Sequence, residues 1–211
     1  MAVQREKLMI SGVAGAIEAV MEFAAEPPKF IGLVCHPHPL YGGTMDNKVV
    51  TSLCREVRDA GGVALRFNFR GVGGSEGSHG GGLLETEDLL AVHAWLMHRW
   101  PGLPLWLAGF SFGSFVAARG AFVLHANGTP VSHLLLVAPP VHHYDFDAIT
   151  DVGCPVTVAL GDEDEVVPVG DMLRWAGDTA LAPDLVRFPG TGHFFHGQLV
   201  ALAAVARHTL P

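Results

Sequence analysis

Short apolar runs of strand length alternate with longer amphipathic runs along almost the whole chain. Continuous apolar runs of this length fit strands buried on both faces, whereas apolar residues three and four positions apart fit helices. The alternation predicts an α/β fold with a mostly parallel central sheet and helices on both of its faces. The expected strands cover residues 8–11, 16–23, 30–37, 63–69, 103–110, 131–140, 154–162 and 184–190, and the expected helices cover 45–61, 83–100, 112–124, 172–180 and 196–210.

The size and composition of the chain fit a single globular domain over residues 1–211. A chain of this length can bury a sizeable core, and its 49% of apolar residues argues against disorder. The net charge is −8, and Lys and Arg form no cluster. This charge argues against nucleic acid and against an anionic membrane surface as partners.

The beginning of the chain has some features of a signal peptide. Arg5 and Lys7 precede an apolar run, but Glu18 and Glu22 interrupt it, so two strands around a turn fit better. No stretch reaches the roughly 18–20 apolar residues that a membrane-spanning helix needs. Three cysteines have spacings that match neither a disulfide framework nor a zinc site: Cys35, Cys54 and Cys154. We therefore expect reduced thiols in a soluble, cytoplasmic protein.

A serine between two glycines stands where a predicted strand gives way to a predicted helix. The segment Gly109-Phe110-Ser111-Phe112-Gly113 matches the pattern G-x-S-x-G of the nucleophile elbow. A turn this sharp brings positions 109 and 113 against neighbouring elements, where only glycine avoids a collision. It predicts an exposed Ser111 at a helix N-terminus, whose dipole favours developing negative charge. Ser111 is therefore the candidate nucleophile.

A serine hydroxyl needs a base to take its proton, and the elbow predicts the chain order serine, acid, histidine. His193 follows the last predicted strand, in a loop whose glycines let the chain turn back over the sheet. His196 and His208 are alternatives, but both fall in or beside the final predicted helix. Four candidates for the acid follow the strand segment PVTVALG at 155–161: Asp162, Glu163, Asp164 and Glu165.

Five segments, taken in order, resemble the α/β-hydrolase superfamily, and in particular its small bacterial serine esterases without a lid, a group similar to dienelactone hydrolases. The segments are VCHPHPLYGGTMDNKVV, FNFRGVGGSEG, GFSFGS, GDEDEVVP and GTGHFF, and they span residues 34–195. The resemblance implies an α/β-hydrolase fold without a cap domain, and an enzyme that needs no cofactor. Dienelactone hydrolases carry a cysteine nucleophile where this chain has Ser111, so their particular activity is not expected.

The resemblance also selects among the four acids. In the family pattern G-x-x-D-x-x-V-P the acid is the fourth residue, which is Asp164 here. Asp162 directly follows Gly161 at the strand end, where a short acidic side chain commonly bonds backbone N–H groups and shapes the turn. Asp162 is therefore expected to stabilise the loop, and Asp164 to hold the histidine.

The oxyanion hole of this fold uses two backbone N–H donors. One comes from the residue after the nucleophile, which is Phe112. The other comes from the loop after the strand at 30–37. Because proline has no N–H, Pro37 and Pro39 are excluded there, which leaves His38 as the expected donor and Leu40 as the alternative.

The substrate pocket is expected beside these groups. Its candidate lining residues are Leu40, Tyr41, Phe110, His142 and Phe194. Family members with a lid insert it most often after the strand at 131–140, but here only residues 141–153 lie there, too few for a folded cap. An open, shallow site that favours short acyl chains is therefore expected.

Two competing interpretations of the motifs are weaker. The run GVGGSEG has Glu76 where a dinucleotide loop needs its third glycine, and it does not follow the first strand. The pairs His36/His38, His142/His143 and His193/His196 lack the spacing H-E-x-x-H, and no Cys/His quartet exists. We therefore expect no dinucleotide and no metal.

The sequence thus predicts a serine hydrolase that cleaves small acyl esters or thioesters through an acyl-enzyme intermediate, with Ser111, His193 and Asp164 as its catalytic triad. The alternatives are a peptidase or an acyltransferase on the same scaffold, and a binding protein that keeps the fold without turnover. The expected partner is a small-molecule ester, and the protein is expected to be a monomer or a homodimer. His142 and His143 are expected either to edge the site or to lie on the surface, and no role is assigned to His196.

Overall fold

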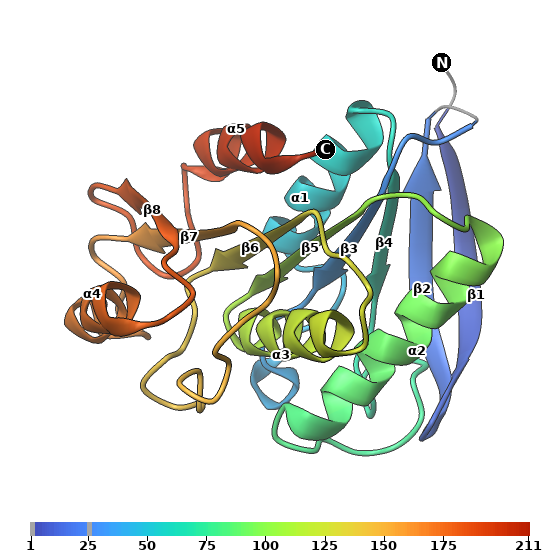
Figure 1. Cartoon of the computed structure of the whole chain (residues 1–211), viewed down its shortest axis with the longest axis horizontal. Helices are drawn as coiled ribbons and strands as arrows, with labels where there is room; N and C mark the ends of the chain where they lie inside the picture. Colours follow the sequence, from blue (N-terminus) through green and yellow to red (C-terminus); the bar gives the residue numbers. More distant parts are fainter. Residues whose placement is uncertain (1–2, 25–26) are drawn as a thin grey trace.

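The computed structural model describes residues 3–24 and 27–211, so residues 1, 2, 25 and 26 of the expected single domain lie outside the described residues. In the described part, eight strands form one sheet in the order β1-β2-β4-β3-β5-β6-β7-β8 (Figure 1). β1 and β2 form a hairpin, β2 pairs antiparallel with β4, and the other neighbouring strands are parallel. The strands are β1 (Gln4–Gly12), β2 (Gly15–Phe23), β3 (Ile31–Cys35), β4 (Val63–Phe67), β5 (Leu105–Phe110), β6 (His133–Val137), β7 (Val156–Gly161) and β8 (Asp184–Phe188).

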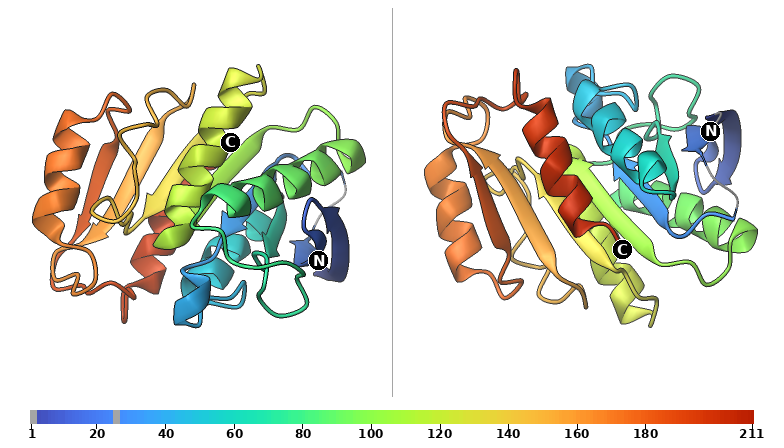
Figure 2. Two further views of the ribbon diagram at one scale, coloured as in Figure 1. Left: turned by 90° about the horizontal axis from the view of Figure 1, so that it is seen from below. Right: turned by 90° about the horizontal axis from the view of Figure 1, so that it is seen from above.

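Helices cover both faces of the sheet. Figure 2 shows α2 and α3 over one face and α1 and α5 over the other. Side chains of alternate strand positions pack against these two layers. In β5, Leu107 belongs to the core under α2 and α3, whereas Trp106 and Phe110 belong to the core under α1 and α5. The helices are α1 (Lys48–Asp59), α2 (Leu83–Arg99), α3 (Phe112–Ala126), α4 (Val169–Asp178) and α5 (Leu199–Thr209).

This architecture confirms the predicted mostly parallel sheet with helices on both faces. Each predicted strand and helix is present, with ends that differ by a few residues. The largest difference concerns β1, which begins at Gln4 rather than at residue 8. β1 is an edge strand whose first residues are mostly exposed, so they lack the apolar pattern from which a buried strand is recognised.

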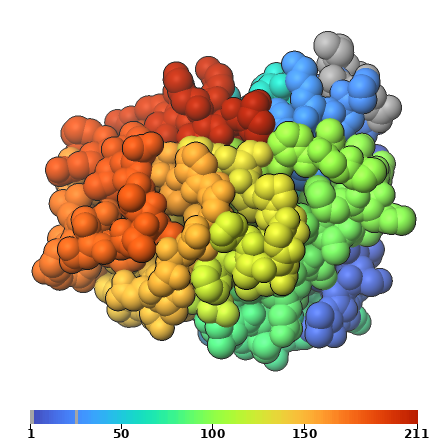
Figure 3. Space-filling model, in the orientation of Figure 1, coloured from blue at the N-terminus to red at the C-terminus, as the bar shows by residue number. Residues whose placement is uncertain are grey.

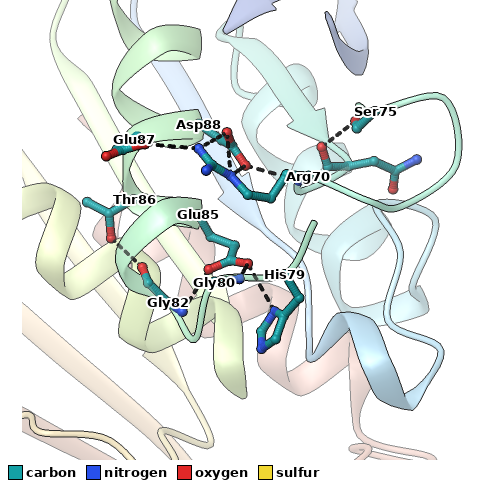
Figure 4. Close-up of polar contacts among 10 residues, drawn as sticks. Arg70, Ser75, His79, Gly80, Gly82, Glu85, Thr86, Glu87 and Asp88 are labelled. Carbon is teal, nitrogen blue, oxygen red and sulfur yellow. Dashed lines mark hydrogen bonds and ion pairs between the residues drawn. The ribbon is translucent and has the colours of Figure 1, made fainter. Parts of the chain in front are cut away.

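The glycine-rich loop after β4 is held by polar contacts on two sides. The Arg70 guanidinium donates to both carboxylate oxygens of Asp88 in α2 at 2.7 to 3.1 Å, and both side chains are buried (Figure 4). On the other side, the Glu76 carboxylate accepts the Ala16 N–H of β2 at 2.7 Å. Breaking the buried pair of Arg70 and Asp88 would leave an uncompensated charge. This pair and the Glu76 contact therefore hold the loop between β2 and α2.

The connection between β6 and β7, residues 138–155, is described in full and contains no helix or strand. Its Tyr144 ring stacks on Phe115 of α3 with 4.8 Å between centroids, and its Phe146 ring lies 5.3 Å from Trp175 of α4. Figure 3 shows the space-filled surface on which this segment lies between α3 and α4. The described residues therefore contain no cap domain, as predicted.

Candidate active site

Ser111 joins the end of β5 to the start of α3 with φ 54° and ψ −123°. A positive φ is uncommon for a residue that carries a side chain. A Cβ on Gly109 would lie 2.0 Å from the carbonyl oxygen of Gly113, and a Cβ on Gly113 would lie 2.4 Å from that of His36. Both positions therefore require glycine, for the reason that the sequence indicated. Ser111 is only 9% exposed, less than predicted, because it lines a cavity and not the open surface.

His193 links Ser111 to Asp164 through its two ring nitrogens. Its Nε2 lies 3.0 Å from Ser111 Oγ, and its Nδ1 lies 2.8 Å from Asp164 Oδ2. The His193 side chain is 3% exposed and the Asp164 side chain 0%, so water has little access to these contacts. A carboxylate on Nδ1 keeps the proton on that nitrogen and leaves Nε2 free to accept the proton of a hydroxyl. The geometry therefore suits activation of the serine.

Asp164 holds the loop after β7 as well as the histidine. Its Oδ1 accepts the N–H groups of Val166 and Val167 at 2.9 and 2.8 Å, while its Oδ2 faces His193. The neighbouring Glu165 accepts the backbone N–H of His193 at 2.9 Å. Two successive acids of one loop thus fix the position of His193, one through its ring and one through its backbone.

The prediction that Asp162 shapes this turn through its side chain is wrong. Asp162 Oδ1 accepts from Arg187 Nε of β8 at 2.8 Å instead. The reason lies in the backbone: Asp162 N–H still donates to Phe188 O of β8 at 3.0 Å, so the strand pairing continues past Gly161. The Asp162 side chain therefore contacts Arg187 of β8, and Asp164 accepts the backbone N–H groups that form the turn.

The two alternative histidines have other partners. His196 Nδ1 lies 2.7 Å from Lys48 Nζ. His208 Nδ1 donates to the carbonyl oxygen of Ala204, one turn earlier in α5, at 2.6 Å. Among residues 3–24 and 27–211, only His193 of these three histidines has a ring nitrogen within hydrogen-bond distance of Ser111.

Two backbone N–H groups beside Ser111 are without an acceptor. They belong to His38 and Phe112, and neither donates to any atom of the described part of the chain. The Leu40 N–H, in contrast, donates to His38 Nδ1 at 3.2 Å where the short 3-10 helix η1 (Pro39–Tyr41) begins. Since His38 and Phe112 also line the cavity at Ser111, their N–H groups are available to a bound oxygen and that of Leu40 is not.

His36 is the fully buried residue at the start of this loop. Its Nε2 accepts the N–H of Phe69 at 3.0 Å, and its Nδ1 donates to the carbonyl oxygen of Pro37 at 2.6 Å. These two contacts require one neutral tautomer. Burial lowers the pKa of His36 to about 4, although the hydrogen bond to Pro37 acts in the opposite direction. The ring thus ties the loop that carries His38 to the segment after β4.

Acid should destabilise the fold through His36. Its pKa is about 6.5 in an unfolded chain and about 4 in the folded protein, so the unfolded state binds the proton first as the pH falls. The stability contribution is therefore complete above pH 6.5, decreases below it, and is lost near pH 4, where the loss reaches about 3 kcal/mol. Denaturant unfolding at several pH values between 7 and 4 measures it. An NMR titration of the His36 ring with a midpoint near its unfolded value would contradict the explanation.

A cavity of about 800 Å³ opens beside the elbow. Of the predicted pocket residues, Tyr41, His142 and Phe194 line it. Leu40 and Phe110 do not. Leu40 is 70% exposed, and Phe110 is buried in the core under α1 and α5, behind the His193 ring at 5.2 Å between centroids.

The cavity also has a wall that the sequence did not indicate. Tyr144 lines it from the connection between β6 and β7, next to His142 and His143, which line it as well. The only available signal for Tyr144 was its proximity in sequence to these histidines, because a segment without regular structure has no periodicity from which to read a buried face.

Three further observations bear on the predictions. Within residues 3–24 and 27–211, no three His, Cys, Asp or Glu side chains lie together in a way that could hold a metal ion. All three cysteines are free, two of them buried. No described helix combines the length and the apolar character that crossing a membrane requires.

Comparisons with known proteins agree with the fold. A protein of Coxiella burnetii described as an α-β serine hydrolase homologue is 39% identical, with a TM-score of 0.90 over 98% of this chain and 97% of that chain. A Xanthomonas campestris protein described as an α/β serine hydrolase without lid is 35% identical, with a TM-score of 0.89 over 99% and 94% of the two chains. An uncharacterised protein of Rickettsia prowazekii is 38% identical over 90% of this chain and 82% of its own length. No protein-family model matches the chain.

Proposed function

Because this chain belongs to the α/β serine hydrolases without a lid, we propose that it hydrolyses small acyl esters or thioesters with Ser111 as the nucleophile. The observation that carries the proposal is the position of His193, whose ring lies between Ser111 Oγ at 3.0 Å and Asp164 Oδ2 at 2.8 Å. A serine, a histidine and a carboxylate in this order form the group that activates a hydroxyl for acyl transfer.

In the first half of the reaction, Ser111 attacks the carbonyl carbon and His193 Nε2 takes its proton. Asp164 keeps the second proton on Nδ1 and stabilises the imidazolium that forms. The carbonyl oxygen becomes negatively charged and receives the free N–H groups of His38 and Phe112. By analogy with other hydrolases, each such donor lowers the barrier by about 2.7–4 kcal/mol.

In the second half, His193 gives its proton to the leaving alcohol or thiol, and the acyl group stays on Ser111. A water molecule then attacks the acyl carbon while His193 takes its proton, the bond to Ser111 Oγ breaks, His193 returns the proton to Oγ, and the carboxylic acid leaves. Apart from the attacking water, each step uses only side chains and N–H groups of this chain. We therefore propose that the reaction needs neither a metal nor a cofactor, and that the partner is a small-molecule ester. The cytoplasm remains the predicted compartment, and a monomer or homodimer the predicted state.

Active-site labelling and an ester panel test this proposal together. A fluorophosphonate should label the folded protein once, on Ser111, and the Ser111→Ala variant should not be labelled. On 4-nitrophenyl esters of increasing straight chain length, kcat/KM should be highest for short chains, because the described residues contain no cap that would cover a long one.

The alternatives predict other results. A kcat/KM that rises steadily beyond about ten acyl carbons would contradict the preference for short chains. If Ser111 is labelled and amides are cleaved faster than matched esters, the protein is a peptidase. If the acyl group is transferred to an added alcohol in preference to water, the protein is an acyltransferase. Folded protein that leaves Ser111 unlabelled would fit a binding protein and rule out the proposed chemistry.

A further inference from the structure

Aromatic side chains form one continuous wall of the cavity. Starting at the rim, the Tyr41 ring lies 4.8 Å from the ring of His38, which lies 4.9 Å from Phe112, and Phe112 lies 5.5 Å from Tyr144. All four residues line the cavity. Tyr41, His38, Phe112 and Tyr144, here called the ring wall, come from the loop after β3, the start of α3 and the connection between β6 and β7.

The ring wall is held in place from behind. Tyr144 stacks on Phe115 of α3 with 4.8 Å between centroids and 25° between planes. The His79 ring packs 4.8 Å from His38 and 5.4 Å from Phe112. His79 Nδ1 in turn lies 2.9 Å from the fully buried carboxylate of Glu85, which also accepts the N–H groups of Gly80 and Gly82 (Figure 4). A ring that enters the cavity past the exposed Tyr41 therefore meets three rings that other side chains hold in place, those of His38, Phe112 and Tyr144.

The cavity is poor in charged side chains. Among the described residues that line it, there is no Asp, Glu, Lys or Arg. Burial lowers the pKa of His38 and of His142, so both imidazoles are neutral at pH 7. Burial also raises the pKa of Tyr144 to about 12, which keeps its hydroxyl protonated. A charged substituent would find no partner on these walls, whereas an uncharged ring would.

The reaction geometry decides which half of the substrate meets the ring wall. The carbonyl oxygen binds at the N–H groups of His38 and Phe112, whose side chains both belong to this wall. The leaving oxygen has to face His193 Nε2, on the side of Phe194, whose ring lies 5.2 Å from that of His193. The acyl substituent points away from His193 and extends along the ring wall.

We propose that the enzyme prefers esters or thioesters whose acyl group carries an uncharged planar aromatic ring, which packs against the ring wall. This inference rests on the proposed hydrolase function and specifies its substrate class. Aromatic pairs at centroid distances of 4.5–7 Å attract one another beyond the effect of buried area, so an aromatic ring should bind better here than a saturated ring of the same size.

A matched pair of substrates tests the proposal. The esters 4-nitrophenyl phenylacetate and 4-nitrophenyl cyclohexylacetate share a leaving group and differ chiefly in whether the ring is aromatic. After each kcat/KM is divided by the rate constant for hydroxide-catalysed hydrolysis of the same ester, the aromatic substrate should be favoured about 10-fold. The Tyr144→Leu variant should reduce this ratio to about 2-fold or less. Leu40→Ala is the matched control and should leave the ratio unchanged, because the Leu40 side chain lies outside the cavity.

The outcomes separate this inference from the function on which it rests. If 4-nitrophenyl acetate is hydrolysed but the corrected ratio is one or less, the inference is wrong and the hydrolase function stands. If the preference appears instead between benzyl acetate and cyclohexylmethyl acetate, the ring belongs to the leaving group and the assignment to the acyl side is overturned. If the wild-type protein hydrolyses no ester faster than Ser111→Ala does, the proposed function fails and the inference falls with it.

Discussion

Replacing Ser111 by alanine should lower kcat for ester hydrolysis by about 10⁴- to 10⁶-fold, by analogy with the loss of the nucleophile in other serine triads. Ser111 Oγ is the group that His193 Nε2 contacts at 3.0 Å, and removing it leaves the base without a proton to take. The residual rate should reflect binding and the oxyanion donors alone.

Folding should hardly change in this variant. Alanine is smaller than serine, and the chain already holds Ala138 and Ala182 at φ 48° and 43°, so a methyl side chain is compatible with the positive φ of 54° at position 111. The measurement is kcat together with the thermal midpoint. A variant that keeps near-normal activity and a normal midpoint would show that another group carries the chemistry.

Replacing Asp164 by asparagine should lower kcat by about 10⁴-fold. The asparagine oxygen can still accept the N–H groups of Val166 and Val167, which hold the side chain in its present orientation. Its NH₂ group then faces His193 Nδ1 and forces that nitrogen to act as an acceptor. The proton moves to Nε2, which can no longer accept the proton of Ser111.

Asp162→Asn is the matched control for this experiment. Asp162 makes its side-chain contact with Arg187, whose side chain is half exposed, so the substitution should cost less than about 1 kcal/mol and leave kcat unchanged. Measuring kcat and the denaturant midpoint of both variants decides between the two aspartates. Loss of turnover in Asp162→Asn with a nearly silent Asp164→Asn would reverse the assignment.

The sheet and the elbow could be predicted because both leave a signal in neighbouring residues. Buried parallel strands are continuous apolar runs, and glycines at 109 and 113 stand where a Cβ would collide with backbone carbonyls. The face of the sheet toward which Phe110 points could not be predicted, because both faces are covered and apolar residues occupy both. Alternation separates two faces only when they differ in polarity.

The candidate site shows a second limit. Asp162 and Asp164 are two residues apart and would share one side of a continuing strand, so the pattern alone could not distinguish them. What distinguishes them is the place where pairing with β8 ends, which depends on contacts between segments distant in the chain. Tyr144 was missed for the same reason, since its packing on Phe115 of α3 brings together parts of the chain that lie far apart in sequence.

The backbone of Ser111, at φ 54° and ψ −123°, has a consequence for how this chain has evolved. A residue held in a sparsely populated conformation destabilises the fold by about 1–3 kcal/mol, and glycine would adopt the same conformation more easily. Selection for stability alone would therefore favour glycine at position 111. The serine at this position therefore indicates that its hydroxyl is kept for a chemical role at the expense of stability. This argues against a binding protein without turnover.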